Sequence, residues 1–404
     1  MAESNQSTIE DRNKKQLQYI LPIFRLGFRP FFLMGALFGF LAIGVWGLSF
    51  SAWFEFSPYG GAYFWHSHEM LFGYTVAIII GFLLTAVQNW TGVQTVKGKA
   101  LAALVSVWLL GRILFAFPLL PTVYIIIVDV LFLPLAACFF AIPIIKVKLW
   151  RNLFFVPILL VMAYLNLLMH LSLHGSVQTS FLVFSHVMVM MIALVMCIMG
   201  GRVIPMFTAN GTQTEKVLPV PLLENLSIAL VIASVIVVSD LITLSTLFQA
   251  VIFISAGVVN FVRAVRWRIW VTIKTPLVWS LHVSYWMMCL GLVLLALNQL
   301  NYLPVGLSAY HAITVGGIGL MTLSMISRVS LGHTGRKIVV GWQMNLAFIF
   351  MFIAFVCRVL VPVFWQDYNT ILLLASLFWL LAFGIFLVKF FPVLTKARID
   401  GGQG

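Results

Sequence analysis

Long apolar runs separated by short polar connections dominate the chain from about residue 29 onward. Each run is roughly 18 to 24 residues long, the length that an α-helix needs to cross the hydrocarbon core of a bilayer. The pattern therefore predicts about twelve membrane-spanning helices. They lie near residues 29–50, 67–89, 100–117, 122–145, 153–172, 178–200, 222–243, 246–262, 276–297, 306–327, 341–361 and 369–391.

This pattern predicts an all-α membrane protein, a polytopic bundle of about twelve transmembrane helices with no repeat and no soluble domain. We expect residues 29–391 to form a single transmembrane domain. Residues 1–28 would be a cytoplasmic N-terminal segment and residues 392–404 a cytoplasmic tail. Residues 1–19 are polar and no small-residue cleavage site follows a short apolar core, so we expect no cleaved signal peptide.

The composition supports the membrane assignment, because 62% of the residues are hydrophobic and only 9% are charged. A formal net charge of +13 would ordinarily direct attention to nucleic acid. Here, however, the lysines and arginines are spread among short connections between apolar runs. That distribution is typical of membrane topology, so we expect no nucleic-acid partner.

The basic residues also predict orientation, because they occur before the first span, after alternate spans and in the tail. The other connections carry almost no lysine or arginine. Cytoplasmic loops are enriched in these residues, so both termini are predicted to be cytoplasmic.

With this orientation, the histidines fall mainly in the outer half of the membrane. His282 lies nearer the cytoplasm and His333 is expected in a cytoplasmic loop. A single histidine of this kind is most often a satisfied interfacial residue, but several on different helices are typical of a functional cavity. The outer histidines are His66, His68, His170, His174, His186 and His311.

Imidazole is a ligand that suits copper and iron, and haem in helical bundles is held by axial histidines. The sequence has no zinc-finger spacing, no Walker loop and no dinucleotide-binding glycine motif. Four cysteines lie inside apolar runs without CxxC spacing and are expected to serve core packing rather than metal binding. They are Cys138, Cys197, Cys289 and Cys357.

The stretch "WHSHEMLFGY" contains His66, His68 and Glu69 at the start of the second predicted span. In a regular helix His66 and Glu69 share a face, whereas His68 points about 200° away from His66. Either His66 lies in the preceding coil, or the two histidines serve different sites. Glu69 could orient His66, carry protons or cap the helix.

Glycines follow His311 in "HAITVGGIGL" and recur as Gly73 and Gly81 in the second span. Such a face could admit a flat macrocycle, or it could serve close packing between helices.

Several stretches resemble the NnrS family of bacterial inner-membrane proteins over about residues 24–340. They are "FRLGFRPFF", "WHSHEMLFGY" with "GFLLTAVQNWTG", "GGRVIPMFT", "PLVWSLHVSYW" and "HAITVGGIGLMTLSMISRVSLGHTGR". The resemblance implies a roughly twelve-helix inner-membrane protein that contains haem b and copper. It also implies a role in the response to nitric oxide, nitrosative stress and denitrification.

The family's histidine motifs map onto His66, His68, His282, His311 and His333. His170 and His186 are added from their depth in the membrane. We expect His68 and His311 to be the pair most needed for metal binding, because they lie at similar depth. His333 is expected not to be a ligand.

We expect Glu69 to act catalytically as a proton relay. Arginines near the cytoplasmic ends are candidates for binding haem propionates through bidentate pairing. They are Arg25, Arg29, Arg202 and Arg328.

The expected function is protection against nitric oxide by redox chemistry at a histidine-ligated metal. Its partners would be nitric oxide or iron–nitrosyl species, an unidentified electron donor and membrane lipid. The alternative is a transporter or a carrier of metal or haem, in which the histidines form a transit site.

Overall fold

The computed structural model describes residues 19–51, 53–302 and 306–402, and every regular element in those ranges is helical. Twelve stretches are long and apolar enough to cross a membrane, which confirms the predicted fold class. These stretches are Phe28–Phe50, Gly61–Thr91, Gly98–Ala116, Thr122–Lys146, Trp150–Leu173, Phe181–Thr212, Pro221–Val238, Thr246–Val265, Pro276–Gln299, Gly306–His333, Trp342–Val363 and Tyr368–Thr395.

Several of these spans contain more than one helical element. The first half of the chain contains η1 (Pro22–Phe24), α2 (Phe28–Phe50), α3 (Gly61–His68), η2 (Glu69–Thr75), α4 (Val76–Thr91), α5 (Gly98–Ala116), α6 (Thr122–Lys146), η3 (Trp150–Asn152), α7 (Phe155–Leu173) and α8 (Phe181–Thr212). The second half contains α9 (Pro221–Val238), α10 (Thr246–Val265), η4 (Ile269–Thr272), α11 (Pro276–Gln299), α12 (Gly306–His311), η5 (Ala312–Gly319), α13 (Leu320–His333), α14 (Trp342–Phe355), η6 (Val356–Leu360), η7 (Val361–Val363) and α15 (Tyr368–Thr395).

The helix boundaries follow local chemistry. Pro221 and Pro276 occupy the first turns of α9 and α11, where a missing N–H costs nothing. Gly92 follows α4 in the left-handed conformation, with φ 68°, a common way for a helix to end. Ser180 caps α8 by accepting a hydrogen bond from the backbone N–H of Leu182.

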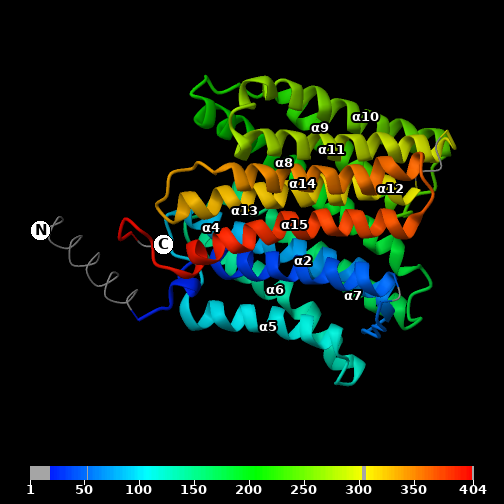
Figure 1. The fold of residues 1–404 in the computed structure, drawn as a ribbon, viewed down its shortest axis with the longest axis horizontal. Coiled ribbons are helices and arrows are strands. Elements are labelled where there is room, and N and C mark those ends of the chain that lie inside the picture. Colours follow the sequence, from blue (N-terminus) through cyan, green and yellow to red (C-terminus); the bar gives the residue numbers. More distant parts are fainter. Residues whose placement is uncertain (1–18, 52, 303–305, 403–404) are drawn as a thin grey trace, which may run out of the picture.

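The spans run side by side along the length of the molecule (Figure 1). Helices α9, α10 and α11 form one flank, and α5, α6 and α7 form the other. Helix α15 packs against both α2 and α14. The first and last described segments lie at the same end of the bundle, on the left in Figure 1, as expected for an even number of crossings.

Three spans are the most buried, and they form the centre of the bundle. The buried share is 78% for Gly61–Thr91, 72% for Phe181–Thr212 and 83% for Gly306–His333, compared with 61% for Pro276–Gln299 and 50% or less for the other spans. Polar side chains on these three central spans therefore face protein rather than lipid. A functional site on them is shielded by the surrounding helices.

The glycines in the central spans serve helix packing. A Cβ at Gly81 would lie 2.8 Å from the Cβ of Phe31, and one at Gly316 would lie 2.6 Å from Cδ2 of Phe355. Neighbouring helices already fill the space that a flat ligand would need. Of the two alternatives from the sequence, close packing between helices is therefore the one that the structure supports.

The structure corrects several boundaries. The second span begins at Gly61 rather than near residue 67, so Glu69 does not cap it. His333, expected in a loop, is the last residue of α13. The last helix extends to Thr395, beyond the expected domain end at 391, and residues 1–18 lie outside the described residues.

The four cysteines form no disulfide, and the expectation of core packing holds for three of them. Cys197, Cys289 and Cys357 are buried, whereas Cys138 is exposed on the outside of the bundle.

Candidate metal centre and the ion cluster beside it

The two histidines of "WHSHEMLFGY" face different neighbours. Because His66 and His68 lie two residues apart in α3, their side chains leave the helix about 200° apart. His66 stacks on Trp46 of α2, whereas His68 contacts residues of α6 and α7. The structure thus shows the second alternative from the sequence, in which the two histidines serve different sites.

His66, His186 and His311 line one cavity of about 150 Å³, which we call the histidine cavity. They come from α3, α8 and α12, and so from the three central spans. Arg358 of η6 lines the same cavity, and no aspartate or glutamate of the described residues does. The cavity therefore combines three imidazoles with one cation.

Each of the three imidazoles has a defined position. His66 stacks on Trp46, with ring centroids 4.3 Å apart, and its Nδ1 is buried without a hydrogen-bond partner among the described residues. His186 stacks on Tyr310 at 3.7 Å. His311 Nδ1 donates to the Leu307 carbonyl at 2.7 Å, which leaves Nε2 as the basic nitrogen. Imidazoles fixed in this way are typical of metal ligands.

Three π-helical segments border the histidine cavity. They are η2, η5 and η6, and they are the only π-helices of residues 19–51, 53–302 and 306–402. The segments contribute Met70, Thr314 and Arg358 to the cavity lining. A π-turn is less stable than an α-turn and occurs mostly at functional sites, where it redirects side chains. Three such segments around one cavity indicate that less stable helical turns are retained there because they position the side chains that line the cavity.

Arg358 was not predicted from the sequence. It is 6% exposed, and its Nη2 donates to the hydroxyl of Tyr368 at 2.8 Å. Among the described residues no carboxylate forms an ion pair with it. The sequence does contain a feature that indicates Arg358, because it lies inside the apolar run "FVCRVLV". Placing an arginine within a membrane span costs free energy unless the residue serves a functional site.

His68 belongs to a separate buried group, which we call the ion cluster. Its Nδ1 lies 3.1 Å from Oε1 of Glu69, and its Nε2 lies 2.7 Å from Oδ1 of Asn166 and 3.2 Å from Oδ2 of Asp129. Both ring nitrogens thus face acceptors, an arrangement that suits an imidazolium. The cluster consists of His68, Glu69, Arg112, Asp129, Asn166 and His170.

Arg112 joins the two carboxylates of the ion cluster. Its Nη1 donates to Oε1 of Glu69 at 2.5 Å, and its Nη2 donates to Oδ1 of Asp129. With His68 protonated, two cations balance two anions, as buried charges require. Arg112 and Asp129 were missed by the sequence reasoning, although each is an isolated charge in an apolar run.

The ligand atoms of His68, Asp129 and His170 lie within 4.8 Å of one another, close enough to hold a metal ion. Each of those atoms, however, already has a hydrogen-bond partner, and Arg112 already neutralises Asp129. A metal ion there would add charge to a balanced group. The arrangement fits a hydrogen-bonded charge network better than a metal centre.

Hydrogen bonds connect the ion cluster to the surface. His170 Nε2 lies 3.3 Å from Oδ2 of Asp129, and its Nδ1 lies 3.1 Å from the hydroxyl of Tyr59. That hydroxyl lies 2.7 Å from Nε2 of the exposed His174. Burial raises the pKa of Tyr59 above its ordinary value, so the hydroxyl keeps its proton at neutral pH. At the other end of the chain of bonds, Oε2 of Glu69 is buried without a partner among the described residues.

The remaining predicted residues lie away from both groups. His282 Nε2 lies 2.9 Å from the Thr208 hydroxyl, and His282 does not line the histidine cavity. Arg328 lies 4.0 Å over the ring of Phe207, and Arg29 donates to the carbonyls of Leu394 and Lys396. Arg25 donates to the carbonyl of Ile20.

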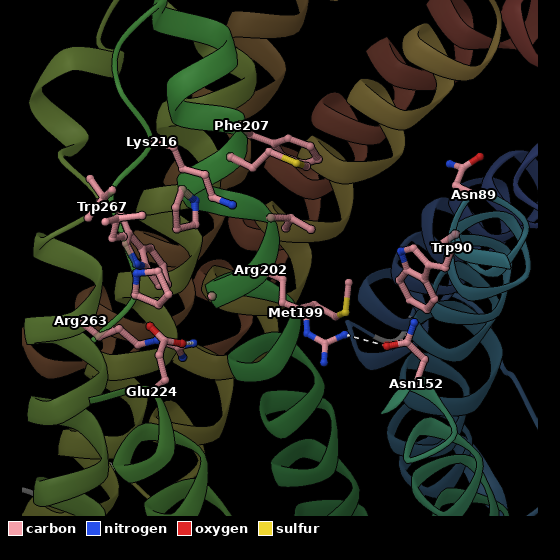
Figure 2. Close-up of a pocket in the computed structure, with 18 of the residues that line it drawn as sticks. Asn89, Trp90, Asn152, Met199, Arg202, Phe207, Lys216, Glu224, Arg263 and Trp267 are labelled. Carbon is pink, nitrogen blue, oxygen red and sulfur yellow. Dashed lines mark hydrogen bonds and ion pairs between the residues drawn. The ribbon is translucent and has the colours of Figure 1, made fainter. Parts of the chain in front are cut away.

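Arg202 and His333 line a larger cavity of about 820 Å³, which we call the basic cavity. Figure 2 shows Arg202 between Trp267 on one side and Trp90 on the other, with its guanidinium directed at Asn152. The donor–acceptor distance from Arg202 Nη1 to Asn152 Oδ1 is 3.4 Å.

A sequence model described as NnrS protein matches residues 22–398, nearly the whole chain. A search of curated proteins found no match. The match covers all twelve spans, including the last two, which the motifs had not covered. This chain belongs to the NnrS family.

Proposed function

We propose that this chain holds copper in the histidine cavity and uses it on nitric oxide or iron–nitrosyl species, as part of the response to nitrosative stress. The observation that carries the proposal is the convergence of His66, His186 and His311 on one cavity. These residues are far apart in sequence, and only the three central spans bring them together. Membership of the NnrS family supports the link to nitric oxide.

The residues of the histidine cavity fit copper. Imidazoles without a carboxylate suit copper, whereas magnesium and calcium require oxygen ligands. Among the described residues, Nδ1 of His66 is buried without a hydrogen-bond partner and Nε2 of His311 is the basic nitrogen of its ring, so both could bind it. When bound, copper would supply a one-electron centre with room for a diatomic ligand. Arg358 would place a positive charge beside that ligand.

The histidine cavity does not fit haem, because about 150 Å³ is less space than a porphyrin needs. Haem b and the bacterial inner membrane remain part of the proposal on the basis of family membership alone. Cytoplasmic termini remain part of it because basic residues recur after alternate spans.

We infer that the ion cluster supplies protons to this chemistry, through Glu69. Neighbouring groups lie within hydrogen-bond distance from the exposed His174 to Glu69. Glu69 is followed in the chain by Met70, which lines the histidine cavity. Reduction of nitric oxide consumes protons together with electrons, so a reductive reaction would also draw on an electron donor, which is unidentified.

The fixed imidazoles favour a resident metal over a carrier. His66 is stacked on Trp46 and His186 on Tyr310, so neither imidazole can easily turn away from a bound metal. A metal held by them would be released slowly. A transport site must pass its cargo on, and rigid, preorganised ligands slow release.

Metal content tests the proposal. Purified His311→Ala and His66→Ala are expected to lose copper and the change in EPR spectrum on adding nitric oxide, while still purifying as monodisperse protein. His333→Ala, at the other end of the bundle, is the matched control and should keep both.

His68→Gln distinguishes the two candidate groups. The sequence paired His68 with His311, but the structure does not bring them together, so His68→Gln should retain copper. Loss of copper from His68→Gln, with full copper in His311→Ala, would move the metal centre to the ion cluster. Rapid metal exchange and counterflow in liposomes would favour the carrier.

A further inference from the structure

The basic cavity lies at the opposite end of the bundle from the histidine cavity, and the proposed metal chemistry makes no use of it. It is bounded by the end of α4, by η3, by α8, by the connection to α9, and by the ends of α10 and α13. Its volume of about 820 Å³ lies within the range of about 300–1,000 Å³ that is usual for small-molecule sites. Side chains from several helices therefore enclose a space large enough for an organic ligand.

Four cations of the cavity have no carboxylate partner. In the described part of the chain, Arg263 pairs with Glu224, but no ion pair involves the other four. All four residues are exposed, and the hydrogen bond from Arg202 goes to a neutral amide, Asn152, so the positive charges remain available to an anion. They are Arg151, Arg202, Lys216 and Arg266.

The deeper walls of the cavity are apolar. Phe82, Met199 and Val203 lie inside membrane spans, and Trp90 and Trp267 stand on opposite sides of Arg202 (Figure 2). A small inorganic anion would contact the cations and leave these walls without a partner. A ligand that has both an acidic group and an apolar body would contact both.

We propose that the basic cavity binds an acidic phospholipid, with its phosphate at Arg202 and Lys216 and its acyl chains along the apolar wall. Basic pockets between transmembrane helices are known to accept acidic lipid headgroups, and guanidinium groups pair with phosphate in bidentate geometry. The lipid interpretation follows from the position of the cavity at the ends of the spans, beside exposed Leu218 and Leu222. A lipid headgroup bound there would lie at the same level as the other headgroups of the surrounding leaflet.

Native mass spectrometry of the detergent-purified full chain, titrated with phosphatidylglycerol, tests the proposal. Arg202→Gln with Lys216→Gln is expected to weaken binding about 25-fold, about five-fold for each cation. Lys99→Gln with Lys337→Gln removes the same charge from the same end without touching the cavity, and should bind like the parent. Because all four side chains are exposed or at a helix end, both double variants should fold, which gel filtration checks.

Four results would overturn the lipid assignment. Equal binding by both double variants would show only diffuse attraction to basic loops. Phosphatidylcholine bound as tightly as phosphatidylglycerol would exclude charge recognition. Glycerol phosphate bound as tightly as the lipid would identify a soluble anion. Loss of haem, with lipid binding unchanged, would assign Arg202 to propionates instead. None of these results depends on copper in the histidine cavity, so the two proposals fail separately.

Discussion

At the scale of single residues, isolated charged residues inside apolar spans indicate where the polar sites of this protein lie. Arg112, Asp129 and Arg358 each interrupt an apolar run, and each is buried at a polar site. Burying such a charge is costly, so a charge kept there is paired or has a ligand. Arg112 and Asp129 are paired with each other, whereas Arg358 faces the histidine cavity.

Removing Arg112 should therefore destabilise the bundle strongly. Arg112→Ala leaves the two buried anions Glu69 and Asp129 with the single cation His68, and we expect a loss of about 3–5 kcal/mol in the free energy of unfolding. Denaturation of the purified protein in detergent measures the change. Lys146→Ala, on an exposed side chain of α6, is the control and should change stability by less than about 0.5 kcal/mol. A similar small change for Arg112→Ala would contradict the charge balance.

At the scale of elements, the irregular part of the second span decides where its side chains point. The change from α3 to η2 occurs at Glu69, which belongs to the ion cluster and is followed by Met70 of the histidine cavity. Gly73 lies within η2, and a Cβ there would lie 2.5 Å from Cε1 of Phe38 and 2.8 Å from Nη1 of Arg112. The π-helical segment therefore depends on a glycine to bring Arg112 close to the helix backbone.

Gly73→Ala should consequently destabilise the protein by about 1–3 kcal/mol, because the added methyl group overpacks the core. Gly44→Ala in α2 is the matched control. The nearest atom to its added Cβ is 3.6 Å away, so the change should be neutral or stabilise by about 0.5–1 kcal/mol. Thermal stability of both variants in one detergent gives the comparison. Equal stability of the two would show that η2 tolerates the methyl group.

At the scale of the whole molecule, both ends of the described chain lie at one end of the bundle. Basic connections are at that same end, which the positive-inside rule assigns to the cytoplasm. On this prediction, we expect the histidine cavity and the exposed His174 to face the periplasm. Nitric oxide and protons would reach the two groups from that side.

A reporter that is active only in the periplasm tests this orientation. Fused after residue 402, it should be silent, and inserted at Gly175 in the loop beyond α7, it should be active. Activity at the tail would reverse the orientation and place the histidine cavity on the cytoplasmic side.

The sequence predicted the spans because apolar runs of membrane length have one stable outcome in a bilayer, a helix with every backbone group satisfied. It also separated His66 from His68, because helical periodicity is fixed by local backbone geometry. Boundaries were less well predicted. The second span was predicted to begin near residue 67 but begins at Gly61, because the helix extends beyond the apolar run into more polar residues.

Which histidines meet was decided by tertiary structure alone. Similar depth made His68 and His311 plausible partners, but depth says nothing about the rotation of a helix about its axis. Packing of the three central spans turns His66 toward His186 and His311, and it turns His68 toward Asp129. Long-range contacts set that rotation, and a pattern along one chain does not contain them. The sequence by itself determined the membrane bundle and the residue types of its site. Only the fold decided which of those residues share a cavity.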